Sequence, residues 1–309
     1  MAKTGTFADS LFKGVLTVFA ATIILVVVAM IAMMFWNSLP TIREFGLGFL
    51  VGSDWQPASD VYGALPFIYG TIVSSVIALI LAVPVSLGIA IFLVEQAPKS
   101  IASPIAFMVE LLAAIPSVVY GLWGIFVLAP FIRNYLGPIL QNYLGWLPLF
   151  QGRLTGIGML TGGVIMAIMV TPIITAVVRD VLEVVPNTQR DAALALGATK
   201  WETTLIVLEN ASSGIAGAVV LGLGRALGET MAVTMVIGNA PQISASLFEP
   251  AYTIASVLAA NFAEATDRLY LSALIEMGLV LFLVTFVVNA AAKVLVMGVA
   301  KGTNAARQA

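Results

Sequence analysis

The sequence predicts an all-α integral membrane protein with six transmembrane helices. Sixty per cent of the 309 residues are hydrophobic and ten per cent are charged, whereas soluble domains carry about 25% charged residues. The mean hydropathy is +1.04. Crossing a bilayer takes about 20 helical residues, and six apolar runs are long enough, at about 15–36, 64–94, 104–129, 156–178, 211–237 and 271–298.

The first apolar run is predicted to be a retained signal anchor. It extends from about Val15 to Trp36 and follows Lys3 and Lys13. This run is longer than the roughly 7–15 residues of a signal-peptide core. We divide the chain into three parts: an N-terminal part with the first helix and an external loop (1–63), a core of five helices (64–300) and a cytoplasmic tail (301–309).

Three prolines lie within the next predicted helices. Pro84 and Pro116 fall inside the second and third spans, and Pro172 falls late in the fourth. Proline removes a backbone donor and clashes with the preceding turn, so the second and third helices are expected to kink.

The distribution of basic residues predicts the topology. With a cytoplasmic N-terminus, the segments near 95–103 and 179–210 and the C-terminal tail lie inside. The inside basic residues are then Lys3, Lys13, Lys99, Arg179, Arg190, Lys200, Lys293, Lys301 and Arg307, against Arg43, Arg133, Arg153 and Arg268 outside. This excess agrees with the positive-inside rule. It leaves 37–63, 130–155 and 238–270 as external segments.

The composition excludes most catalytic classes. The chain has no cysteine and no histidine, which removes thiolate nucleophiles, Ser-His-Asp triads and the commonest metal ligands. It has no Gly-x-x-x-x-Gly-Lys-Ser/Thr motif, so ATP must be handled by another chain. Gly222, Gly224 and Gly228 lie in an apolar span, where helix packing is the expected role. The predicted protein is not an enzyme and binds no metal.

Arg225 and Glu229 are the only charges between Ala211 and Ile237. An arginine at the centre of a membrane helix costs roughly 2.5–3.5 kcal/mol on insertion scales, and a spacing of four places both side chains on one helix face. We interpret Arg225 as a cation on an anion path. Glu229 would hold it at rest and release it transiently to the anion. The alternative is an ion pair that only fixes helix packing.

Two further intramembrane acids are expected to be structural. Glu110 lies in the third span shortly before Pro116, and Glu276 lies near the external end of the sixth, where it could reach the interface.

The cytoplasmic stretch at 186–202 predicts a docking element. Pro186 suits a helix start, Gly197 a helix stop, and a second short helix would begin after Thr199 with Trp201 as an apolar knob. Such a segment could dock in a groove of another protein or lie as an ordinary interfacial helix.

This stretch resembles the EAA loop of ABC-importer permeases. The matching residues are Asp191-Ala192-Ala193, Gly197 and the apolar run Ile206-Val207-Leu208. Three further stretches resemble the PstC-type permease subunits of phosphate-specific ABC importers: Tyr62–Thr71, Ile115–Gly124 and Gly224–Asn239. The chain departs from the EAA pattern in carrying Asp191 for glutamate and Glu209-Asn210 where proline is usual, which leaves the geometry of the following helix open.

The resemblance implies a type I ABC-importer permease fold in the bacterial cytoplasmic membrane. It implies a second permease (PstA-type), two cytoplasmic ATPase subunits (PstB-type) that bind ATP and Mg, and an external phosphate-binding protein (PstS-type). Asp191, Ala192, Ala193, Gly197 and Trp201 would couple this chain to the ATPases, and the chain would bind no cofactor itself. Residue chemistry alone leaves sulfate, molybdate or an ion-coupled secondary transporter of anions as alternatives, and also a membrane scaffold or sensor that does not transport.

Overall fold

The computed structural model describes the backbone of residues 7–306 and the side chains of residues 9–294. Lys3 and Arg307, and the side chain of Lys301, lie outside this range. The helices in chain order are α1 (Phe7–Phe45), α2 (Gly48–Val51), α3 (Leu65–Ile91), α4 (Lys99–Ala114), α5 (Ser117–Trp123), α6 (Ala129–Phe131), α7 (Gly137–Leu144), α8 (Met159–Val184), α9 (Asn187–Ala195), α10 (Lys200–Leu227), α11 (Met231–Val236), α12 (Ile254–Asn261) and α13 (Arg268–Ala306). Three π-helical segments, Phe92–Gln96, Gly124–Leu128 and Ile132–Leu136, extend or join these helices.

The described residues include six helical stretches long and apolar enough to cross a membrane. This confirms the predicted all-α class and the number of spans. Five of the six overlap predicted runs but begin or end elsewhere, for example Phe7–Phe45 against 15–36 and Met159–Val184 against 156–178. Hydropathy locates the apolar centre of each helix, whereas the polar turns at its ends also remain helical.

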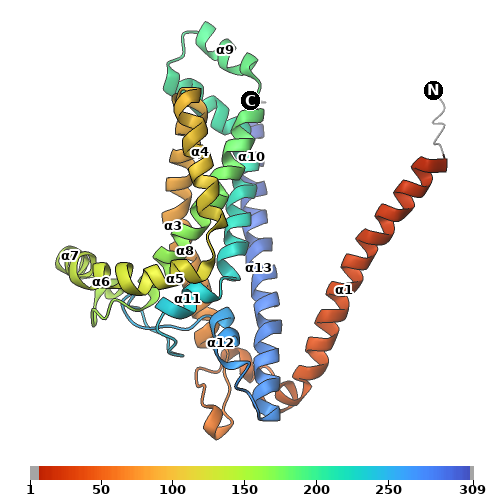
Figure 1. Cartoon of the computed structure of the whole chain (residues 1–309), viewed down its shortest axis with the longest axis vertical. Helices are drawn as coiled ribbons and strands as arrows, with labels where there is room; N and C mark the ends of the chain where they lie inside the picture. The colour runs from red at the N-terminus through yellow and green to blue at the C-terminus, as the bar shows by residue number, and fades with distance from the viewer. Residues whose placement is uncertain (1–6, 307–309) are drawn as a thin grey trace.

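The core of the bundle consists of α3, α8 and α10 (Figure 1). Small residues let these helices approach closely. A Cβ at Gly163 of α8 would lie 2.5 Å from Ile77 of α3, and one at Gly222 of α10 would lie 2.6 Å from Ile174 of α8. The predicted packing role of Gly222 is therefore confirmed within the chain. Pro84 and Pro172 lie inside α3 and α8 without interrupting either helix.

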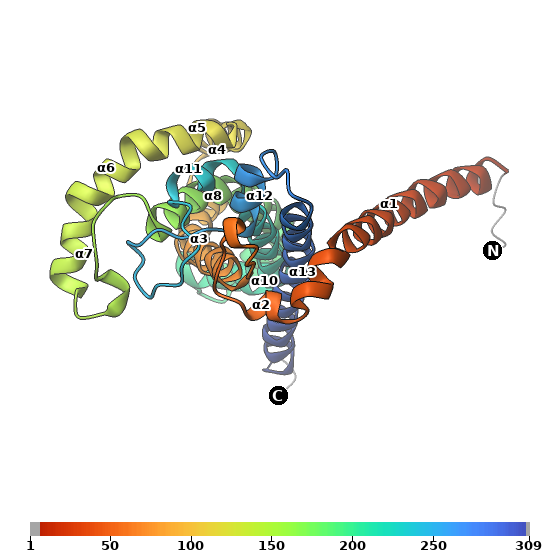
Figure 2. The same cartoon turned by 90° about the horizontal axis from the view of Figure 1, so that it is seen from below.

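The third predicted span, 104–129, is not one helix. It breaks at Pro116, where a kink was predicted. Because proline disfavours a helical conformation of the preceding residue, Ile115 is extended with ψ 129°, and α5 starts only at Ser117. The α4 helix stands beside α8, whereas α5–α7 leave the bundle sideways (Figures 1 and 2). Ser117–Leu144 is one of the six stretches long and apolar enough to cross a membrane, although α5–α7 run across the direction of the bundle and the 16-residue α4 runs along it.

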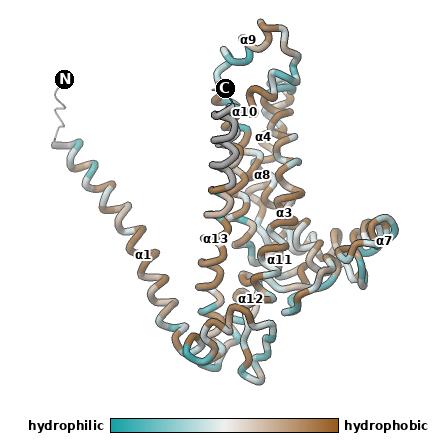
Figure 3. The backbone as a smooth tube through the Cα atoms, turned by 180° about the vertical axis from the view of Figure 1, so that it is seen from behind, coloured by the Kyte–Doolittle hydropathy of each residue, from teal (hydrophilic) through white to brown (hydrophobic). Residues whose placement is uncertain are grey.

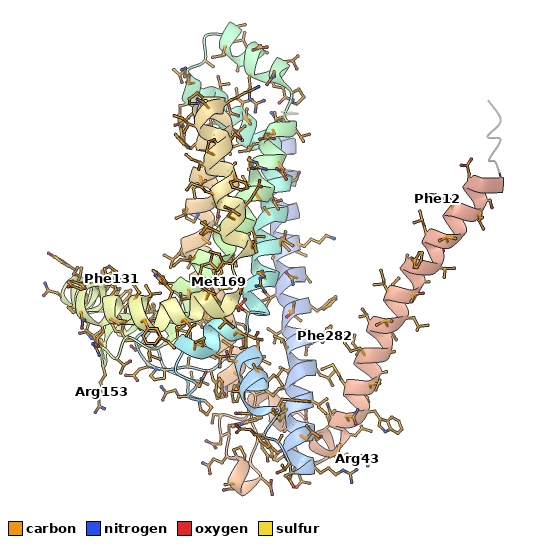
Figure 4. The ribbon with its side chains drawn as sticks, in the orientation of Figure 1. Phe12, Arg43, Phe131, Arg153, Met169 and Phe282 are labelled. Atoms are coloured by element: carbon orange, nitrogen blue, oxygen red, sulfur yellow. The ribbon has the colours of Figure 1, made fainter. Side chains whose placement is uncertain are left out.

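The first helix diverges from the bundle. It packs on α13 near one end, where Met34 lies against Gly278, and its N-terminal part extends away with side chains such as Phe12 exposed (Figures 1 and 4). Apolar residues dominate its length (Figure 3). This helix therefore presents its apolar surface to lipid or to another chain.

The two ends of the bundle differ. The start of α1, the α9 helix and the end of α13 lie at one end, and the loops that follow α1 and α11 lie at the other (Figure 1). Arg43 and Arg153, both expected outside, lie toward that second end (Figure 4). The start of α1 and the end of α13 lie at the same end of the bundle, as an even number of membrane crossings requires.

Candidate functional site

Arg225 lies where a membrane helix breaks. The predicted continuous helix over 211–237 is wrong in this respect, because α10 ends at Leu227 and α11 begins at Met231. Gly228 caps α10, and its N–H donates to the Gly224 carbonyl at 3.4 Å and to that of Ala226. Non-helical backbone at membrane depth is tolerated where protein buries it or a water-filled cavity adjoins it.

The predicted Arg225–Glu229 pair forms at this break. Arg225 Nη2 lies 3.2 Å from Glu229 Oε2, and the two side chains are 48% and 4% exposed. Glu229 Oε1 also accepts a hydrogen bond from the Ala232 backbone N–H at 3.4 Å. Arg225 lies in the last turn of α10, where the helix dipole favours a cation. A buried, fixed carboxylate thus holds one edge of a guanidinium whose other donors face open space.

The surface of α10 around Arg225 is open. Gly217, Leu221, Arg225 and Gly228 lie at helical spacing on one exposed face. A Cβ at Gly224 would meet nothing in the described chain within 4 Å, in contrast to Gly222 on the packed face. The α10 helix therefore has a face closed by α8 and a face that a second helix could approach closely.

The other two intramembrane acids differ from each other. Glu110 of α4 forms an ion pair with Arg179 of α8, with Nη1–Oε1 at 2.9 Å, a pairing that the sequence did not predict because Arg179 fell in the expected cytoplasmic segment. Glu276 of α13 is buried within the chain. Its residue is only 7% exposed, and its Oε2 has no hydrogen-bond partner among the described residues.

The stretch at 186–202 forms the predicted short helix with the predicted ends. Pro186 precedes α9, which ends at Ala195. Gly197 takes the left-handed conformation, with φ +86°. Its N–H donates to the Leu194 carbonyl, and the N–H of Ala198 donates to the Ala193 carbonyl. Glycine adopts such a conformation without the steric cost of a Cβ. This is the physical reason for glycine in the loop.

The predicted coupling residues divide into inner and outer positions. Ala193 is buried against the rest of the chain, whereas Asp191, Ala192 and Gly197 are exposed. Trp201 is 60% exposed and so projects as the predicted knob. Leu194 and Leu196 are also exposed and add apolar surface that the sequence reading did not single out.

The helix after Thr199 is not a short one, as was predicted, but α10 itself. Thr199 and Glu202 form a reciprocal capping box, with Glu202 N to Thr199 Oγ1 at 3.3 Å and Thr199 N to Glu202 Oε2 at 2.7 Å. The helix then passes through Glu209 and Asn210 without a break. The end of the 186–202 stretch, from Lys200 onward, and the fifth predicted span therefore lie in one continuous helix.

Sequence reasoning missed the ion pair between Arg190 and Glu95. Arg190 Nη2 lies 2.7 Å from Glu95 Oε1, with the side chains 16% and 10% exposed. Arg190 directly precedes Asp191, the first residue of the EAA-like motif. This position was a signal in the sequence that Arg190 belongs to the same segment. Glu95 is an ordinary acid after an apolar run, and nothing in its surroundings in the sequence indicates this partner.

Comparisons with known proteins agree with this architecture. Residues 86–301 match the family described as binding-protein-dependent transport system inner membrane component. The chain is 46% identical to the phosphate transport system permease protein PstC of Xylella fastidiosa strain Temecula1, over 94% of this chain and 91% of the relative. It is 37% identical to the probable phosphate transport system permease protein PstC of Methanocaldococcus jannaschii, over 82% and 83%.

Among solved structures, a chain of the MetNI methionine ABC transporter in an inward-facing conformation aligns with a TM-score of 0.48 and 19% identity. The alignment covers 77% of this chain and 94% of that one. On the family match and the identity to its relatives, the chain is a multi-pass membrane protein that belongs to the binding-protein-dependent transport system inner membrane components and, within them, to the PstC permeases.

Proposed function

We propose that this chain is the permease subunit of an ATP-driven importer that moves inorganic phosphate into the bacterial cytoplasm. Arg225 carries the proposal, because it is a half-exposed guanidinium held by a buried carboxylate at a helix break. Arginine presents a planar fork of donors that matches phosphate oxygens. The choice of phosphate over other oxyanions is supported by the names of the relatives.

The open face of α10 supports a pathway shared between two chains. Arg225 and the glycines beside it are uncovered in the single chain, so a second permease (PstA-type) would complete the site. Glu229 competes with the anion for Arg225. A permanently tight arginine–phosphate contact would trap the substrate, and this competition lets the phosphate leave.

The cytoplasmic end supports docking of ATPase subunits. The exposed apolar side chains of Leu194, Leu196 and Trp201 lie within or shortly after the Asp191–Gly197 segment, as expected of a segment that inserts in a groove of a partner. Two PstB-type subunits would bind and hydrolyse ATP with Mg there, and this chain would perform no catalysis. The end with α9 then faces the cytoplasm, and a PstS-type phosphate-binding protein would deliver substrate at the opposite end.

Reconstitution tests the proposal. The tagged chain is co-expressed with PstA-type and PstB-type partners, purified as a complex and placed in proteoliposomes containing ATP, with the phosphate-loaded binding protein outside. We expect uptake of radiolabelled phosphate that requires ATP and persists when ionophores collapse ion gradients. Sulfate and molybdate should not be taken up in its place. Uptake that follows an ion gradient without the ATPases would contradict the proposal.

A further inference from the structure

The side chain of Arg190 joins three elements at the cytoplasmic end of the bundle. It belongs to α9, it pairs with Glu95 in the π-helical segment after α3, and it donates from Nη1 to the carbonyl of Val185 at 2.6 Å and from Nη2 to that of Leu182 at 3.1 Å. Its Nε also donates to Glu95 Oε1 at 3.1 Å. With a further donation from Nη1 to Asn187 Oδ1 at 3.3 Å, these donations use the whole guanidinium fork.

The positions of the acceptors explain why an arginine is placed there. Leu182 and Val185 lie at the end of α8, where carbonyls lack partners within the helix. The negative end of the helix dipole also favours a cation there. Glu95 lies in a π-helical turn, a rare conformation that is frequent at functional sites. The guanidinium therefore satisfies the end of α8 and the end of α3 at once, and lysine, with a single point charge, could not do both.

The contrast with the outer residues of α9 suggests a division of labour. Asp191 and Leu194 face outward and are exposed, so a docking partner would push on them. Arg190 faces inward and is largely buried, with charge-assisted hydrogen bonds that are stronger than neutral ones. A force applied to α9 reaches α3 and α8 through this contact.

We infer that Arg190 and Glu95 are positioning residues that make α9 move as one body with α3 and α8, and so transmit the power stroke of the ATPases to the helices that pack against α10. The inference rests on the proposed function for the existence of a power stroke, but not for the identity of the substrate. When the pair is broken, α9 moves without α3. ATP hydrolysis then continues while transport per ATP falls.

The first test measures coupling in the assembled complex. Glu95→Gln keeps the size of the side chain and removes its charge, and we expect it to co-purify with the ATPases and hydrolyse ATP at the wild-type rate. Coupling free energies between sites correspond to changes of roughly 5–150-fold, and we expect transport per ATP to fall about tenfold. Glu183→Gln is the matched control. It removes the same charge at an exposed position near the end of α8 and should leave the ratio unchanged.

The second test follows the movement itself and needs no phosphate. The chain has no native cysteine, so spin labels can be placed at exposed Thr188 on α9 and exposed Ile80 on α3 by T188C and I80C. In the otherwise unchanged chain we expect one narrow distance distribution that is the same with and without ATP. In Glu95→Gln and in Arg190→Lys we expect it to broaden or shift with ATP.

The outcomes are separable. If Glu95→Gln and Arg190→Lys both keep the wild-type ratio of phosphate transported to ATP hydrolysed and the narrow distribution of spin-label distances, the inference is wrong. If neither variant assembles with the ATPases, the pair only folds the docking segment, and the inference is also wrong. A wild-type complex that hydrolyses ATP but moves no phosphate would contradict the proposed function, whereas the spin-label distances would still decide the role of Arg190.

Discussion

Two arginine–glutamate pairs lie near opposite ends of α10, and they are built differently. Arg190, near the start of α10, is 16% exposed. It joins Glu95, which follows α3, to two backbone carbonyls at the end of α8. Arg225 at its end is 48% exposed and touches Glu229 one turn away at 3.2 Å. The N–H donors of Arg190 are all used by acceptors within the chain, whereas Arg225 has further N–H donors beyond its contact with Glu229.

The difference fits two tasks. A contact that carries force between helices must resist displacement, and a buried arginine with many acceptors does so. A contact that releases a transported anion must be weak enough to be exchanged. The same two residue types can serve both tasks because burial and the number of acceptors set the strength of each pair.

The largest expected effect concerns the stability of the tight pair. Arg190→Ala leaves Glu95 buried without its cation, and breaking a buried pair in this way costs about 3–5 kcal/mol. Arg225→Ala also leaves a buried carboxylate, that of Glu229, without its cation, but it removes a single contact at 3.2 Å, and we expect a smaller loss than for Arg190→Ala. The measurement is unfolding of each purified complex under matched detergent and lipid. Equal losses for the two variants would remove the distinction between the pairs.

The second prediction concerns transport through the loose pair. In an assembled complex, Arg225→Ala should lower phosphate uptake about 100-fold, because charge-assisted hydrogen bonds to an anion contribute about 1.5–3 kcal/mol. Arg225→Lys should recover part of the rate, since a point charge replaces the charge but not the fork. The matched control is Leu221→Ala, one turn earlier on the same face.

Uptake by assembled Arg225→Ala complexes at the wild-type rate would show that the pair only fixes helix packing. That outcome would favour the structural alternative for Arg225 and Glu229. It would leave the role of Arg190 unaffected, because the two pairs share no residue.

Local chemistry was readable from the sequence at the ends of α9 and in the Arg225–Glu229 pair. Pro186 and Gly197 act within a few residues of themselves, and Arg225 and Glu229 are close enough in sequence to meet even though the helix ends between them. The apolar runs likewise predict the crossings, because the bilayer imposes one length on all of them.

Features that depend on tertiary contacts were not readable. Glu95 and Arg190 are 95 positions apart, and only the packing of α3, α8 and α9 brings them together. The break at Gly228 lies inside an apolar run, where hydropathy does not change. The sideways course of α5 depends on how Pro116 redirects the chain, whereas Pro84 and Pro172 leave their helices intact.

A third, smaller effect separates the two faces of α10. A Cβ at Gly222 would lie 2.6 Å from Ile174, so Gly222→Ala should destabilise the chain by about 1–3 kcal/mol through overpacking. A Cβ at Gly224 meets nothing in the described chain, so Gly224→Ala should leave the isolated subunit at least as stable, since alanine is favoured over glycine in a helix by about 1 kcal/mol. Unfolding of the isolated subunit measures both.

The same pair of variants also tests the shared pathway. If a second permease packs on the open face, Gly224→Ala should weaken co-purification of that partner although the subunit itself is stable. Undiminished co-purification would show that the partner packs elsewhere, and the open face would then belong to the anion path or to lipid.

The smallest expected effect lies at the first turn of α10. Thr199→Ala removes the cap that accepts the Glu202 N–H, and such losses are about 1 kcal/mol. Glu202→Gln should be nearly neutral, because glutamine also completes a capping box. Hydrogen exchange of the first turn of α10 reports both changes locally. If the rod from Thr199 to Leu227 acts as one unit with the tight pair, fraying in Thr199→Ala should stay within that first turn and leave transport per ATP unchanged. A loss of coupling in Thr199→Ala as large as that in Glu95→Gln would instead place the transmission of force in the cap of α10, and the tight pair would then serve only to hold α9 in place.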